Sequence, residues 1–205
     1  MIIKVCGMRD ADNIREVEAI GVDLMGFIFS PKSSRYVSEP PTYLPTECKR
    51  VGVFVDASIG DVMTIVEQYQ LNIIQLHGNE SPSYITQLRS HLPKVVKIIK
   101  AFNIATDADL NNTKAYQGLA DYFLFDAKGE SAGGNGHKFD WSILSAYNGH
   151  TPFLLSGGIG PDDAECIRTF QHPHFQGIDL NSKFEISPAL KDTNKLQCFL
   201  KQIEL

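Results

Sequence analysis

The sequence predicts an α/β protein whose 205 residues form a single-domain (β/α)8 barrel, a TIM barrel, over residues 1–205. Short apolar runs alternate with amphipathic stretches along the chain, which is typical of repeated β/α units. The runs are apolar at successive positions, as expected for parallel strands that helices cover. Two runs, PFLLSGGIG at 152–160 and GIDLNSKFE at 177–185, stop in small polar turns, as the last strands of a phosphate-binding barrel do.

Composition and charge narrow the class of protein. Hydrophobic residues make up 43% and charged residues 21%, which is ordinary for a soluble globular domain. The net charge of −5, without a Lys/Arg run, argues against a nucleic-acid partner, and no apolar stretch predicts a membrane span. The segment MIIKVCGMRD lacks a signal-peptide pattern, and the four cysteines form no CxxC pair or zinc spacing. We therefore expect a cytoplasmic protein with reduced thiols.

Each strand is predicted from a short run of apolar and β-branched residues. In chain order these runs lie at 2–6, 23–29, 50–55, 73–76, 95–100, 122–125, 153–155 and 177–180. Each helix is predicted from apolar residues at helical spacing, such as Ile14, Val17 and Ile20 in the first. The helices lie, in order, at 9–20, 59–69, from Pro82 onward, 107–117, 140–147, 161–170 and about 192–203.

Residues at the ends of these segments support the boundaries. Ser and Asp side chains accept hydrogen bonds at helix starts, proline fits the first turn, and glycine suits the position after the last turn. The expected caps are, in order, Asp10 or Asp12, Gly21, Ser58, and Ser81 with Pro82. The Pro- and Ser-rich residues 30–49 predict a long loop with a short helix, which completes eight strand–helix cycles, and residues 127–138 predict a glycine-rich loop.

An open, doubly wound sheet is the alternative arrangement of the same elements. It predicts a GxGxxG nucleotide turn after the first strand, but only Gly7 follows that strand, so the closed barrel is preferred. In a barrel, the residues that carry chemistry sit at the C-terminal ends of strands and in the loops after them. This rule selects, before any family is considered, Cys6, Arg35, His77, Asp126, Asp179 and two glycine-rich or polar turns.

Cys6 and Asp126 together suggest acid–base chemistry. A free cysteine at a strand end is often only a small buried hydrophobe, and a strand-end aspartate is often a cap or an ion-pair partner. To act as a base, Cys6 needs a pKa lowered by nearby positive charge, such as that of Lys4 on the same face of the strand. If both groups share one pocket, their environments push the two pKa values apart and assign the acid and base roles.

Positive and dipolar groups predict an anionic substrate. Arg35 is either a solvated loop residue or a bidentate grip on a carboxylate, and His77 is either a satisfied core histidine or a pocket residue. Backbone N–H groups in the turns after the seventh and eighth strands offer a phosphate cradle. The residues of these turns are Gly157, Gly158, Asn181, Ser182 and Lys183.

Taken together, these motifs closely resemble the phosphoribosylanthranilate isomerase family of tryptophan biosynthesis. The resemblance runs in family order over nearly the whole chain. It rests on KVCGMRD at 4–10, MGFIFSPKSSRYV at 25–37, VGVFV at 51–55, IQLHGNE at 74–80, FLFDA at 123–127, GGNGHKFDW at 133–141, LLSGGI at 154–159 and GIDLNSKFE at 177–185.

The resemblance implies an Amadori rearrangement of N-(5-phosphoribosyl)anthranilate to 1-(2-carboxyphenylamino)-1-deoxyribulose 5-phosphate, without a metal or an organic cofactor. It implies that Cys6 is the general base, Asp126 the general acid and Arg35 the anchor of the anthranilate carboxylate. It also implies that His77 and Asp179 line the pocket, with the phosphate at the two turns. The implied partner is this small-molecule substrate, and the protein is expected to be a monomer or a homodimer.

Two positions depart from the family pattern. Asn135 stands in GGNG where the family often has GGTG, and Lys183 stands where the family often has glycine. If position 183 needs a positive φ, lysine is unfavourable there; if its side chain reaches the phosphate, it adds a positive charge.

Other functions of a barrel make different demands on the sequence. A pentose-phosphate epimerase usually needs a bound metal or a paired-aspartate arrangement, and it would leave Cys6 and Arg35 without an obvious use. A catalytically silent binding barrel would be expected to lack Cys6 or Asp126. A histidine-pathway aminoimidazole substrate would bring a second phosphate, and the sequence predicts one cradle only.

Overall fold

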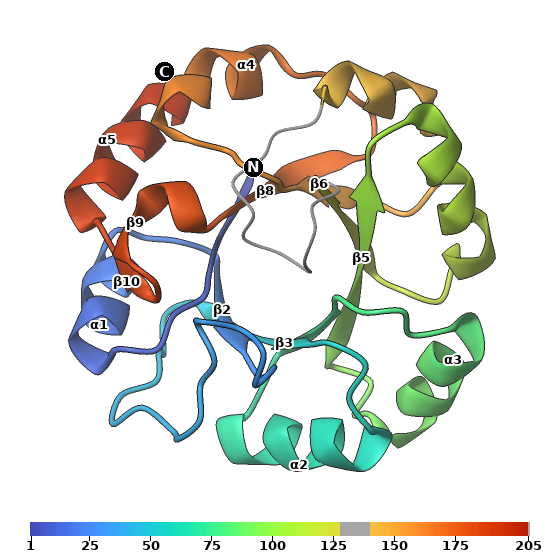
Figure 1. Ribbon diagram of the computed structural model, residues 1–205, viewed down its shortest axis with the longest axis horizontal. Coiled ribbons are helices and arrows are strands. Elements are labelled where there is room, and N and C mark those ends of the chain that lie inside the picture. The colour runs from blue at the N-terminus through green and yellow to red at the C-terminus, as the bar shows by residue number, and fades with distance from the viewer. Residues whose placement is uncertain (128–139, 205) are drawn as a thin grey trace.

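The computed structural model of this protein is a closed barrel of eight parallel strands, which confirms the predicted fold class. The structure describes residues 1–127 and 140–204. The strands neighbour one another in chain order, and the last pairs with the first to close the ring. Figure 1 shows the view down the barrel, with the helices on its outside. Within the described residues, no helix has the length and apolar character to cross a membrane.

Every predicted strand is present, within a few residues of its predicted bounds. The barrel strands are β1 (Ile2–Cys6), β2 (Leu24–Ile28), β3 (Lys49–Phe54), β4 (Ile73–Leu76), β5 (Lys97–Ile104), β6 (Tyr122–Ala127), β7 (Phe153–Leu155) and β8 (Phe175–Leu180). The α-helices are α1 (Ala11–Ala19), α2 (Ile59–Tyr69), α3 (Pro82–His91), α4 (Ala164–Thr169) and α5 (Thr193–Glu204). The 3-10 helices are η1 (Asp107–Tyr116), η2 (Trp141–Ala146), η3 (Pro161–Asp163) and η4 (Ser182–Phe184).

Local signals set the helix starts as the sequence predicts. Asp10, Ser58 and Ser81 each accept a hydrogen bond from a backbone N–H in the first turn of α1, α2 and α3. These N–H groups have no partner within the helix, so each cap satisfies a group that would otherwise depend on water. Gly21 follows α1 with a φ of +90°, a conformation that favours glycine.

The barrel interior changes from apolar to polar along its axis. Alternate side chains of each strand point inward. Towards the N-terminal ends of the strands, the inward residues form one buried apolar cluster of Leu24, Val51, Ile73, Ile99, Ala101, Leu124 and Leu154. Two positions further along their strands, the inward residues include the buried polar side chains of Lys4, Gln75, Asp126 and Asp179. The apolar layer therefore closes one end of the barrel, and polar groups face the other.

A buried ion pair joins the first and last strands. Lys4 and Asp179 are in register across β1 and β8, and the Lys4 Nζ donates to Asp179 Oδ1 over 2.9 Å. Their side chains are 0% and 5% exposed, so water screens the pair very little. Burial lowers the pKa of Lys4, but the charge and hydrogen bond of Asp179 raise it more, so the lysine stays charged.

The predicted short helix between the second and third strands is wrong. Residues 30–48 form turns and bends without a helix. This segment contains four prolines, which supply no N–H group for a helix ladder. The backbone N–H groups of Thr46 and Glu47 donate instead to the Glu18 carboxylate of α1, each over 2.6 Å. The crossover from β2 to β3 is thus a loop held by a side chain, and the predicted count of eight strand–helix cycles falls one helix short.

Other helices are tighter or shorter than predicted. Residues 107–117 and 140–147 were expected to be α-helical, but they hold the 3-10 helices η1 and η2, and 161–170 begins with η3 before α4. In η1 the sequence DADLNNTKAY is rich in Asp, Asn and Thr, whose side chains compete for backbone groups. Asp109, for example, accepts from the backbone N–H groups of Ala105 and Thr106.

A short antiparallel hairpin, β9 (Glu185–Ser187) and β10 (Leu190–Lys191), follows β8 and was not predicted. It lies beside α1 on the outside of the ring (Figure 1). The buried amide of Asn13 on α1 fixes it there: Asn13 Nδ2 donates to the Lys191 carbonyl over 2.9 Å, and Asn13 Oδ1 accepts from the Lys191 N–H over 2.7 Å.

We expect Lys4→Met to lower the free energy of unfolding by about 3–5 kcal/mol, because Asp179 is left as an unpaired buried charge. The double variant Lys4→Met/Asp179→Leu should recover most of this loss, since it removes both charges. Denaturant titrations of the three proteins measure the difference. Equal unfolding midpoints for the wild type and Lys4→Met would show that the pair does not hold the seam of the barrel.

Candidate active site

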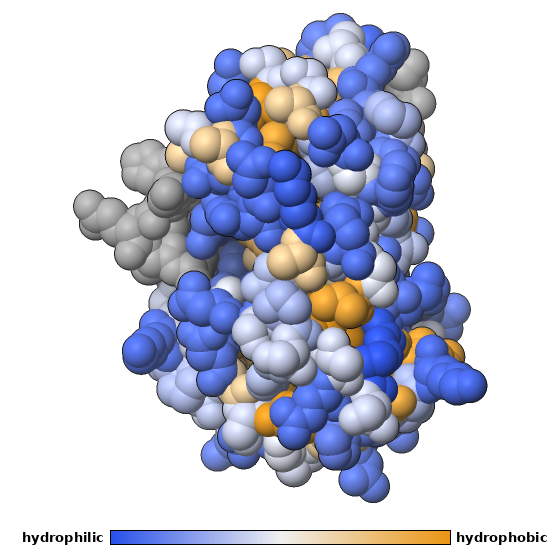
Figure 2. Space-filling model, turned by 90° about the vertical axis from the view of Figure 1, so that its right-hand side faces the viewer, coloured by the Kyte–Doolittle hydropathy of each residue, from blue (hydrophilic) through white to orange (hydrophobic). Residues whose placement is uncertain are grey.

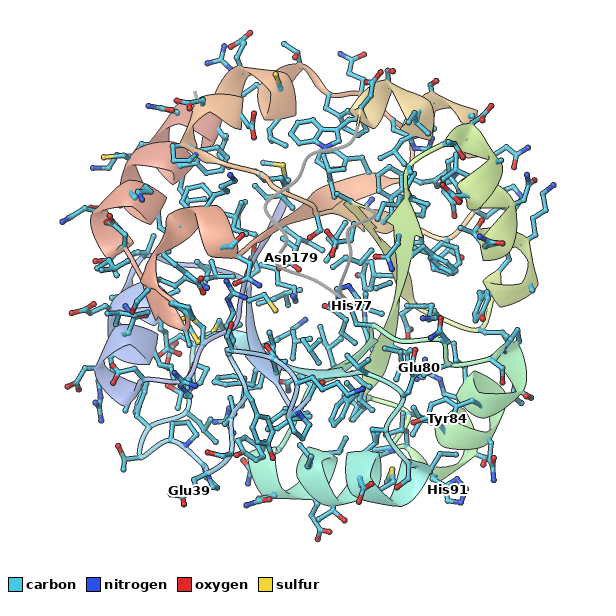
Figure 3. The ribbon with its side chains drawn as sticks, viewed as in Figure 1. Glu39, His77, Glu80, Tyr84, His91 and Asp179 are labelled. Carbon is cyan, nitrogen blue, oxygen red and sulfur yellow. The ribbon has the colours of Figure 1, made fainter. Side chains whose placement is uncertain are left out.

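The C-terminal ends of the strands bring together four of the predicted site residues. Cys6 ends β1, His77 follows β4, Asp126 lies in β6 and Asp179 in β8. Cys6, Asp126 and Asp179 are buried, and the His77 side chain is only 10% exposed. His77 and Asp179 both lie inside the ring of strands in Figure 3. The charges of Asp126 and His77 both act on the pKa of Asp179, so these groups share one electrostatic environment.

The Cys6 thiol is buried among charged groups. The charges of Lys4, Asp179 and Lys191 all act on the pKa of this thiol. Burial raises the pKa of Cys6, and the positive charges of the two lysines offset this rise only in part. The structure therefore does not support the expected lowering of this pKa by Lys4. The reason is that Cys6 is buried and the lysine charge is already paired with Asp179.

Two glycines make room for site side chains. A Cβ added at Gly26 on β2 would lie 2.7 Å from the Cys6 sulfur. A Cβ added at Gly7, which has a φ of +80°, would lie 2.6 Å from Cδ of Arg35. The signal for Gly26 was present in the sequence, because a glycine within an apolar strand often marks the close approach of another group.

Asp126 lies between a backbone N–H and the His77 ring. Its Oδ1 accepts from the N–H of Ala127 over 2.9 Å, and its Oδ2 lies 3.2 Å from His77 Nε2. The approach of the His77 ring is not linear enough for a direct hydrogen bond, so Nε2 has no aligned acceptor among the described residues. On the other side of the ring, His77 Nδ1 lies 3.0 Å from the Gln75 amide nitrogen.

The predicted glycine turn after β7 packs directly against Asp126. Gly157 and Gly158 have φ values of +87° and +72°, which other residues rarely adopt. A Cβ at Gly157 would lie 2.3 Å from the Ala127 backbone nitrogen and 3.0 Å from Asp126 Oδ1. Only glycine therefore lets this turn approach the end of β6.

The predicted turn after β8 meets the turn after β7. Asn181, Ser182 and Lys183 lead into η4, and the first carbons of the Lys183 side chain lie 3.6–3.7 Å from a Cβ built on Gly160. Lys183 is not among the residues with positive φ, so lysine causes no backbone strain there. The two turns thus lie side by side, as a shared phosphate cradle requires.

Arg35 is held by a glutamate that the sequence analysis did not single out. Its Nε and Nη2 donate to the two carboxylate oxygens of Glu185 over 2.8 and 2.7 Å, and the hydrogen bonds raise the pKa of Arg35. Glu185 also accepts from Lys191 over 2.6 Å, and Lys191 donates to Asn181 over 2.9 Å. Glu185 and Lys191 lie on the hairpin, so β9 and β10 connect the Arg35 loop to the turn after β8.

Some sequence predictions lie outside the described residues. The glycine-rich loop predicted at 127–138 and the segment 133–136, with Asn135, fall almost wholly in this part of the chain. Among the residues that the structure does describe, no group of three His, Cys, Asp or Glu side chains is placed to hold a metal ion.

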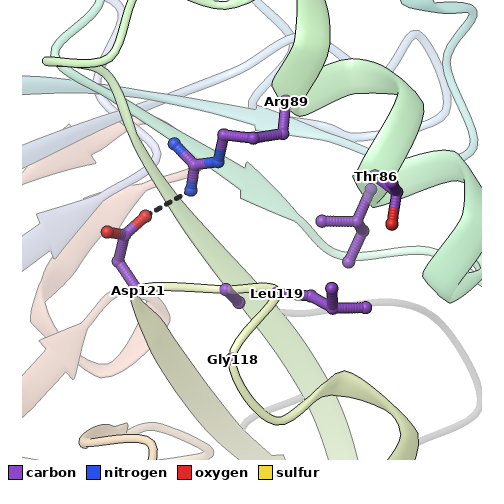
Figure 4. Close-up of a pocket in the computed structure, with 7 residues that line it drawn as sticks. Thr86, Arg89, Gly118, Leu119 and Asp121 are labelled. Atoms are coloured by element: carbon purple, nitrogen blue, oxygen red, sulfur yellow. Dashed lines mark hydrogen bonds and ion pairs between the residues drawn. The ribbon is translucent and has the colours of Figure 1, made fainter.

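A cavity of about 330 Å³ lies away from this site, between α3 and the start of β6 (Figure 4). Inside it, Arg89 pairs with Asp121 over 2.5 Å and donates to the Val96 carbonyl over 2.7 Å. Arg89 thus connects α3 to the strands. Figure 2 shows this side of the molecule as mainly hydrophilic, with small separate apolar areas. The paired arginine and the position before β6 favour a structural role for this cavity over a substrate site.

Comparison with known proteins gives a consistent family. A family model of N-(5'phosphoribosyl)anthranilate (PRA) isomerase matches residues 3–202. The N-(5'-phosphoribosyl)anthranilate isomerase of Parabacteroides distasonis is 52% identical to this chain, over 99% of this chain and 93% of its own length. The phosphoribosyl anthranilate isomerase structure from Thermotoga maritima is 28% identical, with a TM-score of 0.83, over 100% of this chain and 99% of that one. A structure of phosphoribosyl anthranilate isomerase in complex with reduced 1-(o-carboxyphenylamino)-1-deoxyribulose 5-phosphate is 27% identical to this chain, with a TM-score of 0.82. The match covers 100% of this chain and 99% of that one.

Glu185→Gln should weaken the fold at neutral pH and flatten its response to acid. Burial raises the pKa of Glu185, but the hydrogen bonds of Arg35 and the charge of Lys191 lower it more, so the net pKa is depressed. A depressed acid stabilises the fold above its unfolded pKa of about 4.3, and this contribution is lost as pH falls through the folded value.

Urea unfolding at pH 7 and at several values below pH 5 measures both effects. We expect a loss of about 3 kcal/mol at pH 7 and a shallower decline on acidification than in the wild type. Glu39→Gln, at an exposed glutamate, is the matched control and should follow the wild type. If the free energy of unfolding changes with pH in the same way in both variants, Glu185 does not stabilise the fold as predicted.

Proposed function

This chain belongs to the N-(5'-phosphoribosyl)anthranilate isomerase family, and on that premise we propose how its site performs the reaction. The substrate is N-(5-phosphoribosyl)anthranilate, and the product is 1-(2-carboxyphenylamino)-1-deoxyribulose 5-phosphate, within tryptophan biosynthesis. One observation carries the proposal: a thiol and a carboxyl group, Cys6 and Asp126, lie at strand ends of the same barrel mouth, near the two turns predicted to bind a phosphate.

In the first step Asp126 is the general acid. It donates a proton to the ring oxygen of the ribose, and the bond between C1 and that oxygen breaks. The lone pair of the anthranilate nitrogen forms the C=N bond of an iminium ion. The carboxylate that remains is stabilised by the Ala127 N–H, which already donates to Oδ1, and by His77 next to Oδ2.

In the second step Cys6 is the general base. It removes the C2 proton, the C–H electron pair forms the C1=C2 bond, and the iminium pair returns to nitrogen. The resulting enolamine then tautomerises to the ketone. Because burial raises the pKa of Cys6, the thiol must lose its proton to water before this step. The iminium charge, added to those of Lys4 and Lys191, favours the thiolate at that moment.

The two anionic ends of the substrate are held by different segments. The phosphate binds the turns with Gly157, Gly158 and Asn181 to Lys183, where backbone N–H groups and the lysine side chain are available. The anthranilate carboxylate binds Arg35. Since Nε and Nη2 of Arg35 are bonded to Glu185, the substrate contact falls to Nη1. Clamping both ends fixes C2 relative to the sulfur, and this orientation lowers the barrier.

The proposal places the reaction in the cytoplasm, where thiols stay reduced. All four cysteines are free, and Cys6 is buried at the site. A reducing compartment suits a mechanism that needs this thiol unmodified.

Cys6→Ser and Asp126→Asn should each reduce kcat by roughly 100- to 10,000-fold with little change in KM, because each removes one positioned proton transfer. Turnover is followed by the loss of substrate fluorescence, with substrate made in situ from anthranilate and phosphoribosyl pyrophosphate. Cys198→Ser makes the same chemical change at an exposed cysteine of α5 and should keep full activity. Near wild-type kcat in either site variant would remove that residue from its proposed role.

Lys183→Met should raise KM by about tenfold and leave kcat unchanged, because a contact with the non-reacting phosphate holds substrate and transition state equally. The effect should shrink as salt is added, since the contact is exposed and ionic. Lys201→Met, at an exposed lysine of α5, is the control. An unchanged KM would show that Lys183 does not reach the phosphate.

A further inference from the structure

We propose that Gln75 is a positioning residue that sets which nitrogen of the His77 ring carries the proton, and so directs the Nε2–H group towards Asp126. The inference rests on the proposed role of Asp126 as the acid. It assigns Gln75 a task that acts through His77, and it gives His77 a defined task.

Gln75 lies inside the barrel directly below His77. It is on β4, between Val53 of β3 and Ile99 of β5 in the sheet register, and only 1% of its surface is exposed. Gln75 and His77 are two residues apart, so both side chains point to the barrel axis. Water therefore contributes little to the bonding of the amide, and its neighbours inside the barrel determine its orientation.

The amide and the imidazole form a contact that depends on the tautomer. Gln75 Nε2 lies 3.0 Å from His77 Nδ1. An amide nitrogen can only donate, so Nδ1 must accept, and a neutral ring then carries its proton on Nε2. Reversing the amide would require the opposite tautomer. The present orientation leaves Oε1 and the second amide N–H without a partner among the described residues.

The tautomer decides how His77 acts on Asp126. With the proton on Nε2, the ring presents a donor group 3.2 Å from Asp126 Oδ2. Asp126 Oδ1 already accepts from the Ala127 N–H. Each oxygen of the carboxylate left after proton delivery then has an N–H group beside it, which favours delivery. With the proton on Nδ1, the Nε2 lone pair would face the carboxylate and oppose the same step.

The burial of Gln75 argues that it serves catalysis more than stability. Its Oε1 is buried without a partner among the described residues, which is an energetic cost to the fold. The inward residues below it on neighbouring strands are apolar, and an apolar residue of similar size would avoid this cost. A polar side chain at this position is therefore better explained by what it does to His77.

Nitrogen-15 NMR of the His77 ring tests the proposal directly, because protonated and unprotonated ring nitrogens have well-separated chemical shifts. The wild type, Gln75→Met and Gln75→Glu are labelled at histidine, and His77→Gln identifies the signals. The methionine keeps the volume and removes the amide. The glutamate carboxylate accepts from Nδ1–H and so imposes a proton there. Gln87→Met, at an exposed glutamine of α3, is the matched control.

We expect the wild type and Gln87→Met to carry the proton on Nε2. Gln75→Met should show a mixture of tautomers, with kcat reduced about ten- to hundredfold and KM within about twofold, because the donor to Asp126 is no longer held in place. Gln75→Glu should place a proton on Nδ1 and lower kcat at least as far. Thermal unfolding should show Gln75→Met to be at least as stable as the wild type.

A wild-type ring protonated on Nδ1, or one that keeps the Nε2 proton in Gln75→Met, would overturn the proposal. So would a changed tautomer with unchanged kcat. The proposed acid role of Asp126 fails separately, through an active Asp126→Asn variant, and the tautomer of the free protein does not depend on that result.

Discussion

The polar mouth of this barrel depends on the charge of Lys4, buried beneath Cys6 and paired with Asp179 across the β1–β8 seam. The thiol and the two aspartates, Asp126 and Asp179, are all buried there. Negative charge on more than one of them would be strongly unfavourable without a counter-ion in the same low-dielectric space. Lys4 supplies positive charge at the seam, where the barrel closes over these acidic side chains.

The rest of the site is rigid because charged side chains hold one another. Glu185 binds Arg35 through both of its carboxylate oxygens. Lys191 links Glu185 to Asn181 in the turn after β8. Lys100 does the same beside His77: it donates to Glu80, whose carboxylate accepts from the Gly78 N–H. Such supporting contacts keep reactive groups in place more firmly than loops alone can, because each side chain has few alternative conformations.

The sequence alone predicts the features that depend on interactions between residues close together in the chain. All eight strands follow from apolar runs, the caps at Asp10, Ser58 and Ser81 follow from their side chains, and the rule of strand ends finds Cys6 and Asp126. What was missed depends on residues far apart in the chain. The pair of Arg35 and Glu185 spans 150 positions, and the loop at 30–48 replaces a helix because Glu18 on α1 accepts its N–H groups. The sequence could not show that burial raises the pKa of Cys6 more than the nearby lysine charge lowers it.

The amide contact between Asn13 and Lys191 joins positions 178 residues apart, so it can form only once nearly the whole chain is present. During synthesis α1 forms early, yet its hydrogen-bonding partner is made only after β8. Until then β1 and the newest strand both present unpaired edges, which can pair with other chains. The same late event delivers the hairpin that holds Arg35. Barrel closure and the placement of the hairpin beside Arg35 therefore both depend on the last part of the chain.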